Sequence, residues 1–423
     1  TMCASDLSEH HFLNTILQMK WGQLFDLKAE GYFYTRLQNP TNDAVAAKIA
    51  ELEGGVAALL TSSGQAANFY AVFNICEAGD HVVAASTIYG GTFNLLAVTF
   101  KKLGIDCTFV DTDASAEEIA DAFRPNTKFF FAETIANPAL VVLDIEKFAS
   151  VAHQHGVPLI VDNTFATPIN CRPFEWGADI ITHSTTKYMD GHGLQVGGAI
   201  IDSGNFDWEA YGDKYHGLTQ PDESYHGVVY TKQFGKKAYI TKATSQLMRD
   251  LGSIPSPNNC FLLNIGLETL PLRMERHCSN AQKTAEFLAS HEKVSKVIYP
   301  GLPGDKYHAL AEKYLHNEQN VTRFIIVSNR AVYEKKSQKV SVCFELPHER
   351  RTLIICFPIL YITTEYVKDR VQTYSGKNLG ISFLCGFPGE SGGSGSKKTL
   401  SGGLEAEANR VRVLGNYGLQ EEA

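Results

Sequence analysis

The chain of 423 residues has a formal net charge of -8, with 44% hydrophobic and 20% charged residues. This composition is that of a globular protein, and the length is enough for two or three domains. Lysine and arginine are spread along the sequence, which argues against nucleic-acid binding, and no apolar run approaches the roughly 18 to 20 residues of a membrane span. We therefore expect a small-molecule substrate and a cytoplasmic location.

Between about residues 55 and 200, short β-branched and aromatic runs alternate with longer amphipathic stretches. This alternation predicts a doubly wound, mainly parallel α/β sheet, which binds ligands at the carboxyl ends of its strands. The predicted strands are HVVAAS (81–86), DCTFVD (106–111), KFFFAET (128–134), PLIVDN (158–163) and ADIITHS (178–184). The predicted helices between them are 64–79, 90–104, 116–124 and 144–156.

The pattern changes near SIPSPNN (253–259), where serine, proline and asparagine precede a long helical stretch at 261–291. We interpret this change as a boundary between a large domain, 46–252, and a smaller α/β domain, 253–423. Within the second domain, GESGGSGSKKTLSGG (389–403) has the composition of a flexible segment.

Nine cysteines are scattered along the chain without a CxxC pair or the spacing of Cys/His metal ligands. The sequence therefore indicates neither a disulfide framework nor a metal site. Cys76, Cys107 and Cys171 lie in or beside apolar segments, and we interpret them as small buried side chains.

Two chemically distinctive residues follow neighbouring predicted strands. Asp162 ends one apolar strand, and Lys187 follows the next one in THSTTKYMDGHG. A partly desolvated lysine is a good amine nucleophile toward an aldehyde, and a buried aspartate needs a cationic partner such as a protonated pyridine nitrogen. The pair suits pyridoxal phosphate (PLP), although either residue alone is more often a capping or surface side chain.

Other residues near the same sheet edge suit the rest of such a cofactor. SSGQAAN (62–68) opens a helix, so the N–H groups of Gly64 and Gln65 are candidate phosphate donors, as are the hydroxyls of Ser184 and Thr186. Plain helix capping is the common alternative for such a turn.

Four further residues are candidates for contacts with the cofactor's ring and phosphate. Tyr89 in IYGGT is a candidate to stack on a pyridine ring, or else a packing residue. Asn137 in ETIANPAL is a candidate donor to a phenolic oxygen, and Tyr34 and Arg36 in YFYTRLQNPT suit a phosphate.

Taken together, six motifs make the sequence resemble the Cys/Met-metabolism PLP family, over about residues 31 to 317. They are YTRLQNPT, LEGGVAALLTSSGQAA, IYGGT, ETIANPAL, IVDNTFATP and HSTTKYMDGHG. Within this family, LTQPDESYHGVVYTKQFG (218–235) and LETLPLRMERHCSNAQ (267–282) resemble segments of the O-acetylhomoserine sulfhydrylases.

The resemblance implies a fold type I PLP-dependent transferase. Lys187 would form the Schiff base, Asp162 would face the pyridine nitrogen, Tyr89 would stack on the ring, and Gly64, Gln65, Ser184 and Thr186 would hold the phosphate. Residues 1–45 would form an arm from which Tyr34 and Arg36 reach a neighbouring subunit's site, in a homotetramer built from dimers.

The implied activity is the conversion of O-acetylhomoserine and sulfide or a thiol to homocysteine or methionine. A γ-lyase yielding 2-oxobutanoate is the alternative enzyme. A chain that binds PLP without turnover is the other alternative, because the expected carboxylate-binding arginine motif is absent after about Asn317, and Arg410 and Arg412 do not match its spacing.

Overall fold

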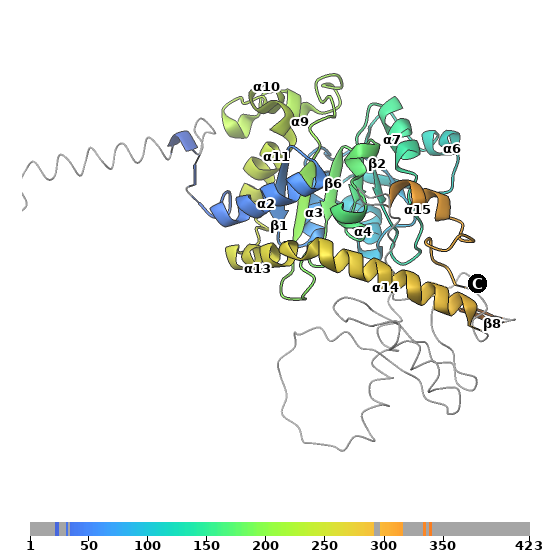
Figure 1. Cartoon of the computed structure of the whole chain (residues 1–423). Helices are drawn as coiled ribbons and strands as arrows, with labels where there is room; N and C mark the ends of the chain where they lie inside the picture. The colour runs from blue at the N-terminus through green and yellow to red at the C-terminus, as the bar shows by residue number, and fades with distance from the viewer. Residues whose placement is uncertain are drawn as a thin grey trace, which may run out of the picture.

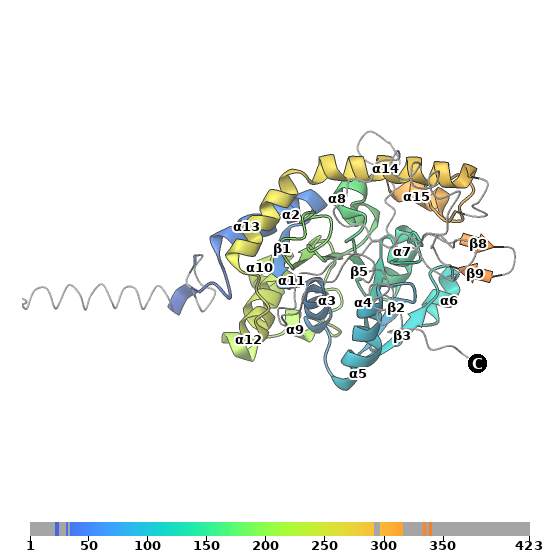
Figure 2. The ribbon, with the colours of Figure 1, turned by 90° about the horizontal axis from the view of Figure 1, so that it is seen from below.

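The computed structural model describes residues 22–24, 31–32, 34–291 and 297–315, and the backbone of 333–335 and 338–340. Its centre is a seven-stranded sheet in the order β1-β7-β6-β5-β4-β2-β3, with helices packed on both faces (Figure 1 and Figure 2). Strands β6, β5, β4, β2 and β3 run parallel, whereas β7 runs antiparallel to both β1 and β6. The predicted α/β fold with a mainly parallel sheet is therefore confirmed.

All five predicted strands are present, at nearly the predicted positions. They are β2 (His81–Ala85), β3 (Asp106–Val110), β4 (Thr127–Glu133), β5 (Leu159–Asp162) and β6 (Ile180–His183). The sequence analysis missed β1 (Ala57–Thr61) and β7 (Gly198–Asp202). Their short apolar runs have no alternation by which a buried strand can be told from a buried helix.

The four predicted helices are also present, although they end earlier than predicted. They are α3 (Gly64–Phe73), the continuous helical segment of α4 (Gly90–Asn94), the π-helical η1 (Leu95–Thr99) and α5 (Phe100–Lys102), then α6 (Ala116–Ala120) and α7 (Ile145–Gln154). The predicted stretch 261–291 is two helices, α13 (Pro257–Glu268) and α14 (Leu270–Ser290). Pro271 explains the break, because it has no N–H to continue the hydrogen bonds of α13.

The other helices connect these elements or cover the sheet. They are α2 (Pro40–Glu53), α8 (Thr167–Asn170), η2 (Pro173–Trp176), α9 (His216–Thr219), η3 (Glu223–Tyr225), α10 (Tyr230–Phe234), η4 (Gly235–Lys237), α11 (Ala238–Lys242), the π-helical η5 (Ala243–Met248), α12 (Arg249–Leu251) and α15 (His308–Tyr314). A separate hairpin pairs β8 (Tyr333–Lys335) with β9 (Gln338–Val340). The segment 389–403 and most of the predicted second domain lie outside the described residues.

Helices on both faces explain why the central strands are apolar throughout. In β4, Phe129, Phe130 and Phe131 follow one another and are all fully buried. Successive side chains of a strand point to opposite faces, so a run of this kind requires cover on both sides. The chain has polar side chains at the ends of these strands instead, which is where the site lies.

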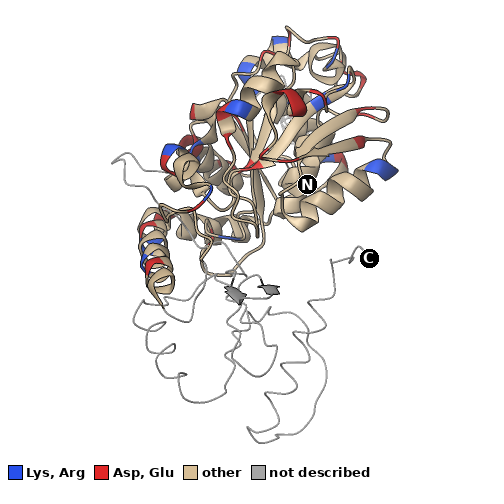
Figure 3. Cartoon of the chain, turned by 90° about the vertical axis from the view of Figure 1, so that its right-hand side faces the viewer, with Lys and Arg blue, Asp and Glu red and all other residues tan. Residues whose placement is uncertain are grey.

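The surface carries charges of both signs, and Cys76 and Cys171 are buried as expected, whereas Cys107 is only half-buried. Acidic and basic residues are interspersed over the face shown in Figure 3. In the part of the chain that the structure describes, no helix is long and apolar enough to cross a membrane. Cys76, Cys107 and Cys171 are free, and burial raises their pKa values, that of Cys107 to about 12.

We predict that Asp202→Asn stabilises the protein at alkaline pH. Asp202 ends β7 fully buried, and its Oδ1 accepts a hydrogen bond from Gly204 N at 2.8 Å. Burial raises the pKa of Asp202 to about 7, above the unfolded value, so its contribution to stability is lost as the pH rises through 7. Asparagine keeps the acceptor for Gly204 and carries no charge.

Thermal unfolding of both proteins at pH 5 and pH 8 checks this prediction. Between these pH values the free energy of unfolding of the wild type should fall, relative to the variant, by on the order of 2 kcal/mol. A difference that is the same at both pH values would contradict it.

Candidate active site

The predicted site residues gather at one edge of the sheet, where the parallel strands end. Asp162 is the last residue of β5, and Ser184 directly follows β6. Gly64 begins α3 just after β1, which runs in the same direction as β6 because both are antiparallel to β7. Tyr89 is the N-cap residue of α4, in the connection that follows β2.

The first turn of α3 packs directly against the segment that follows β6. A Cβ atom on Gly64 would lie 2.6 Å from Ser184 Cβ and 2.8 Å from its Cα, so only glycine fits here. Ser63 caps α3 by accepting a hydrogen bond from Ala66 N at 3.1 Å. The N–H groups of Gly64 and Gln65 have no acceptor within the helix. With the Ser184 hydroxyl beside them, they are suitable donors for an anion.

Thr164 connects Asp162 to Ser184. Its hydroxyl donates a hydrogen bond to Asp162 Oδ1 and accepts one from Ser184 N at 2.8 Å. Thr164 N also donates to Asp162 Oδ1 at 3.0 Å. One oxygen of Asp162 is thus fixed by its neighbours, which leaves Oδ2 as the oxygen available to a ligand.

Glu133, which the sequence analysis missed, joins two predicted site residues. It is the last residue of β4 and is buried. Its Oε1 accepts a hydrogen bond from Tyr89 N at 2.7 Å, and its Oε2 accepts one from Asn137 N at 3.2 Å. The sequence signal was present in ETIANPAL, because an acid at the end of an apolar strand is the same pattern that identified Asp162.

The position of Glu133 also determines its electrostatics. Glu133 pairs in register with Asp162 across β4 and β5, so the two carboxyl groups are neighbours on one face of the sheet. Burial, and secondly the charge of Asp162, raise the pKa of Glu133 well above its ordinary value. The arrangement therefore favours the neutral form of Glu133.

A second polar layer lies behind the site, formed by the alternate residues of the same strand ends. Asn163 accepts a hydrogen bond from the Thr134 hydroxyl at 2.8 Å and donates to Glu53 Oε1 at 2.9 Å. His183 Nε2 lies 2.6 Å from the same Glu53 oxygen. This buried network connects α2 to the ends of β5 and β6.

Lys187 is exposed, whereas the sequence analysis expected a partly desolvated lysine. Thr186 also differs from expectation, because its hydroxyl already donates to Gly197 O at 3.2 Å and accepts from Gly197 N at 3.1 Å. To donate to a phosphate, it would first have to release Gly197.

Among the residues that the structure describes, no hydrogen bond or ion pair connects Tyr34 or Arg36 to these residues. Both are exposed and precede α2, and the Arg36 guanidinium lies over the Tyr34 ring, 5.1 Å from its centroid.

The tyrosine ring of Tyr89 is also half exposed, at 49%, and lies against Gly91. The residues around 410, which were compared with the expected arginine motif, lie outside the described part of the chain.

Together these features fit pyridoxal phosphate. Gly64 provides a close approach that a Cβ would block, amide and hydroxyl donors suit a phosphate, and Asp162 and Lys187 suit the ring nitrogen and aldehyde. The fold and the site define a fold type I PLP-dependent enzyme.

The comparisons with known proteins agree. Residues 12–347 match the family described as Cys/Met metabolism PLP-dependent enzyme. The chain belongs to this family, and its match extends beyond the segment 31–317 that the motifs indicated.

Named relatives and solved structures cover most of the chain. Identity is 50% over 296 residues to a homocysteine/cysteine synthase from Kluyveromyces lactis, covering 70% of this chain and 66% of the relative. It is 49% over 300 residues to an O-acetyl-L-homoserine sulfhydrylase from Leptospira meyeri, covering 69% and 67%. The chain thus spans about two thirds of these relatives' length.

A solved structure from Campylobacter jejuni is described as an O-acetylhomoserine (thiol)-lyase with N'-pyridoxyl-lysine-5'-monophosphate. It superposes with a TM-score of 0.69 at 38% identity, covering 74% of this chain and 76% of that chain.

We predict that Glu133→Ala weakens both the fold and the cofactor site. The change leaves the partly buried N–H groups of Tyr89 and Asn137 without their acceptors, at a cost of about 1 to 3 kcal/mol in the free energy of unfolding. Glu133→Gln keeps one acceptor oxygen and a neutral side chain, so we expect an intermediate loss. Denaturant unfolding and titration with PLP check this order, which equal effects of the two substitutions would contradict.

Proposed function

We propose that the chain catalyses the PLP-dependent replacement of the acetate group of O-acetyl-L-homoserine by sulfide or a thiol, giving L-homocysteine or methionine. The observation that carries this proposal is the family match over residues 12–347, which contains every candidate site residue. Relatives named homocysteine synthase and O-acetyl-L-homoserine sulfhydrylase support the choice of reaction.

Different residues of the described part of the chain would bind different parts of the cofactor. Gly64, Gln65 and Ser184 would hold the phosphate through two amides and a hydroxyl, and Thr186 is the candidate for a further donor. Tyr89 would contact the ring, and Asn137 would donate to the phenolic oxygen. When bound, PLP supplies an electron sink for carbanion chemistry.

Three residues would control the charge on the cofactor ring and the transfer of protons. Asp162 keeps a proton on the ring nitrogen, because an ionised carboxylate stabilises the protonated form. Glu133, which burial favours in the neutral form, adds no second negative charge beside it. Lys187 would hold the cofactor through its amine, and the same amine would move protons at the substrate's α and β carbons.

The proposed assembly is a homotetramer of dimers in which each site is shared. The exposure of Lys187, Tyr34 and Arg36 supports it, because the exposure of all three is explained if Tyr34 and Arg36 reach the phosphate of a neighbouring subunit. A cytoplasmic location is part of the same proposal, supported by the free cysteines, which suit a reducing compartment.

An assay of the PLP-loaded chain with O-acetylhomoserine, with and without sulfide, tests the reaction. We expect sulfide-dependent homocysteine and acetate in equal amounts, and a loss of at least about a thousandfold in Lys187→Ala, which lacks the reacting amine. Formation of 2-oxobutanoate without sulfide would instead identify a γ-lyase. Bound PLP without either product would identify a chain that binds the cofactor but does not turn over.

A mixing experiment tests the shared site. Lys187→Ala and Arg36→Ala chains should each be nearly inactive, yet hybrids contain one intact site. After unfolding and refolding together, about a quarter of the wild-type activity should return, because half of the dimers are hybrids with one working site of two.

The matched control mixes Lys187→Ala with a chain that carries both substitutions, so that no hybrid has a reactive lysine. Activity no greater than in this control, in hybrids shown to form, would mean that Arg36 acts within its own chain.

A further inference from the structure

In the turn that carries Lys187, backbone N–H groups of the turn donate hydrogen bonds to several of the turn's own carbonyl groups. Lys187 N donates to Ser184 O at 3.2 Å, Asp190 N donates to Thr185 O at 3.0 Å, and Gly191 N donates to Lys187 O at 2.8 Å. The carbonyls of Tyr188 and Met189, the two residues that follow Lys187, have no such partner within the turn and face α14 instead.

Arg273, in the first turn of α14, supplies the missing donors. Its Nη1 donates to Tyr188 O at 2.6 Å, and its Nη2 donates to Met189 O at 3.3 Å. The same guanidinium donates to Gly266 O at 2.7 Å and, through Nε, to the Thr269 hydroxyl at 3.0 Å. One rigid planar group thus joins the lysine turn to the junction of α13 and α14.

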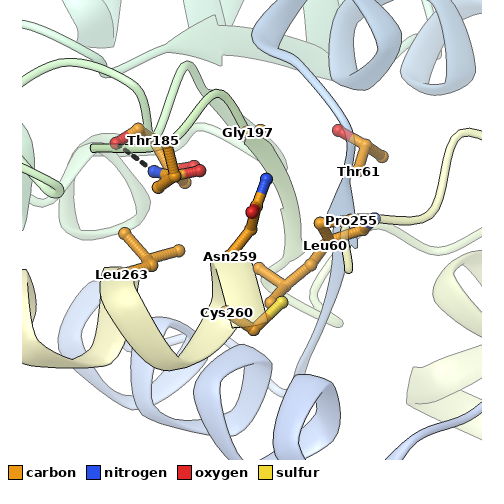
Figure 4. Close-up of a pocket in the computed structure, with 10 residues that line it drawn as sticks. Leu60, Thr61, Thr185, Gly197, Pro255, Asn259, Cys260 and Leu263 are labelled. Atoms are coloured by element: carbon orange, nitrogen blue, oxygen red, sulfur yellow. Dashed lines mark hydrogen bonds between the residues drawn. The ribbon is translucent and has the colours of Figure 1, made fainter. Parts of the chain in front are cut away.

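The surrounding segments pack closely around this guanidinium. A Cβ on Gly191 would lie 2.1 Å from Arg273 Nη1, and a Cβ on Gly266 would lie 2.4 Å from Asp190 O. On the neighbouring side of the turn, α13 presents Asn259, Cys260 and Leu263 toward Thr185 and Gly197 across a narrow crevice (Figure 4). The lysine turn therefore rests on these two helices, and Arg273 is the ionic group that fastens it there.

We propose that Arg273 is a positioning residue, which fixes the direction of Lys187 by holding the carbonyls of Tyr188 and Met189. This inference rests on the proposed role of Lys187 as the cofactor lysine. If these carbonyls rotated, the peptide planes next to Lys187 would rotate with them and the amine would point elsewhere. A lysine at position 273 would keep the charge, but its ammonium group cannot donate in the fixed planar directions that the two carbonyls and Gly266 O require.

The test compares Arg273→Lys with Arg276→Lys, the same substitution at an exposed position one helical turn further along α14. Hydrogen exchange of the Asp190 and Gly191 amides is measured in the full chain before PLP is added. The PLP concentration that gives half-maximal labelling of Lys187 is then measured by borohydride reduction and peptide mass spectrometry. Thermal unfolding is recorded for each protein.

In Arg273→Lys, we expect both amides to exchange faster than in the wild type. Half-maximal labelling should require a PLP concentration higher by roughly tenfold or more, since charged hydrogen bonds to carbonyls are lost. Arg276→Lys should match the wild type in both measurements. Lower thermal stability with unchanged exchange and labelling would show a merely structural role and overturn the proposal, as would wild-type behaviour throughout.

The same data separate this proposal from the proposed site. If the wild type is labelled at a lysine other than Lys187, the role of Lys187 is refuted and the positioning inference with it. If Lys187 is labelled at the same PLP concentration in all three proteins, the inference about Arg273 alone is refuted.

Discussion

The register between β4 and β5 places two acids side by side at the edge of the sheet, and the site depends on this constraint. Glu133 and Asp162 are partners in that register, so neither can move without shifting a strand. Two charges this close in a buried place are costly, and the raised pKa of Glu133 relieves the conflict by favouring its neutral form. Glu133 accepts hydrogen bonds from Tyr89, in the loop after β2, and from Asn137, in the loop after β4. These bonds hold both loops at the same end of the sheet.

Because successive side chains of a strand point to opposite faces, the polar side chains at this edge of the sheet form two layers. Glu133, Asp162 and Ser184 face the site, while the residues next to them point the other way. Thr134, Asn163 and His183 form the buried network with Glu53 behind them. Since each layer holds the same strand ends from opposite sides, the donors and the carboxylate are in place before any ligand arrives, which lowers the entropic cost of binding.

The sequence was sufficient for features that depend on local pattern. Five strands followed from β-branched runs, and so did the placement of Asp162 at the end of β5 and of Ser184 directly after β6, whereas the roles of these residues and of Lys187 stay predictions. Contacts between distant segments could not be predicted, because nothing in ETIANPAL shows that Glu133 meets the amide of Tyr89, 44 positions away. The bonds from Arg273 to the lysine turn join residues 84 and 85 positions apart, and no periodicity in α14 distinguishes this arginine from Arg276.

The exposure of Lys187 is the remaining difference between expectation and structure, and it has a physical reading. An amine that reacts at neutral pH is helped by low solvent access, yet here Leu194 and Val196 in the following loop are 60% and 56% exposed. An exposed Lys187 next to exposed apolar side chains is unfavourable for an isolated chain, and both exposures would fall if another surface covered them. The proposed contribution of Tyr34 and Arg36 from a neighbouring subunit would supply such a surface, and the desolvation that the sequence analysis expected for Lys187 would then be a property of the assembly rather than of the single fold.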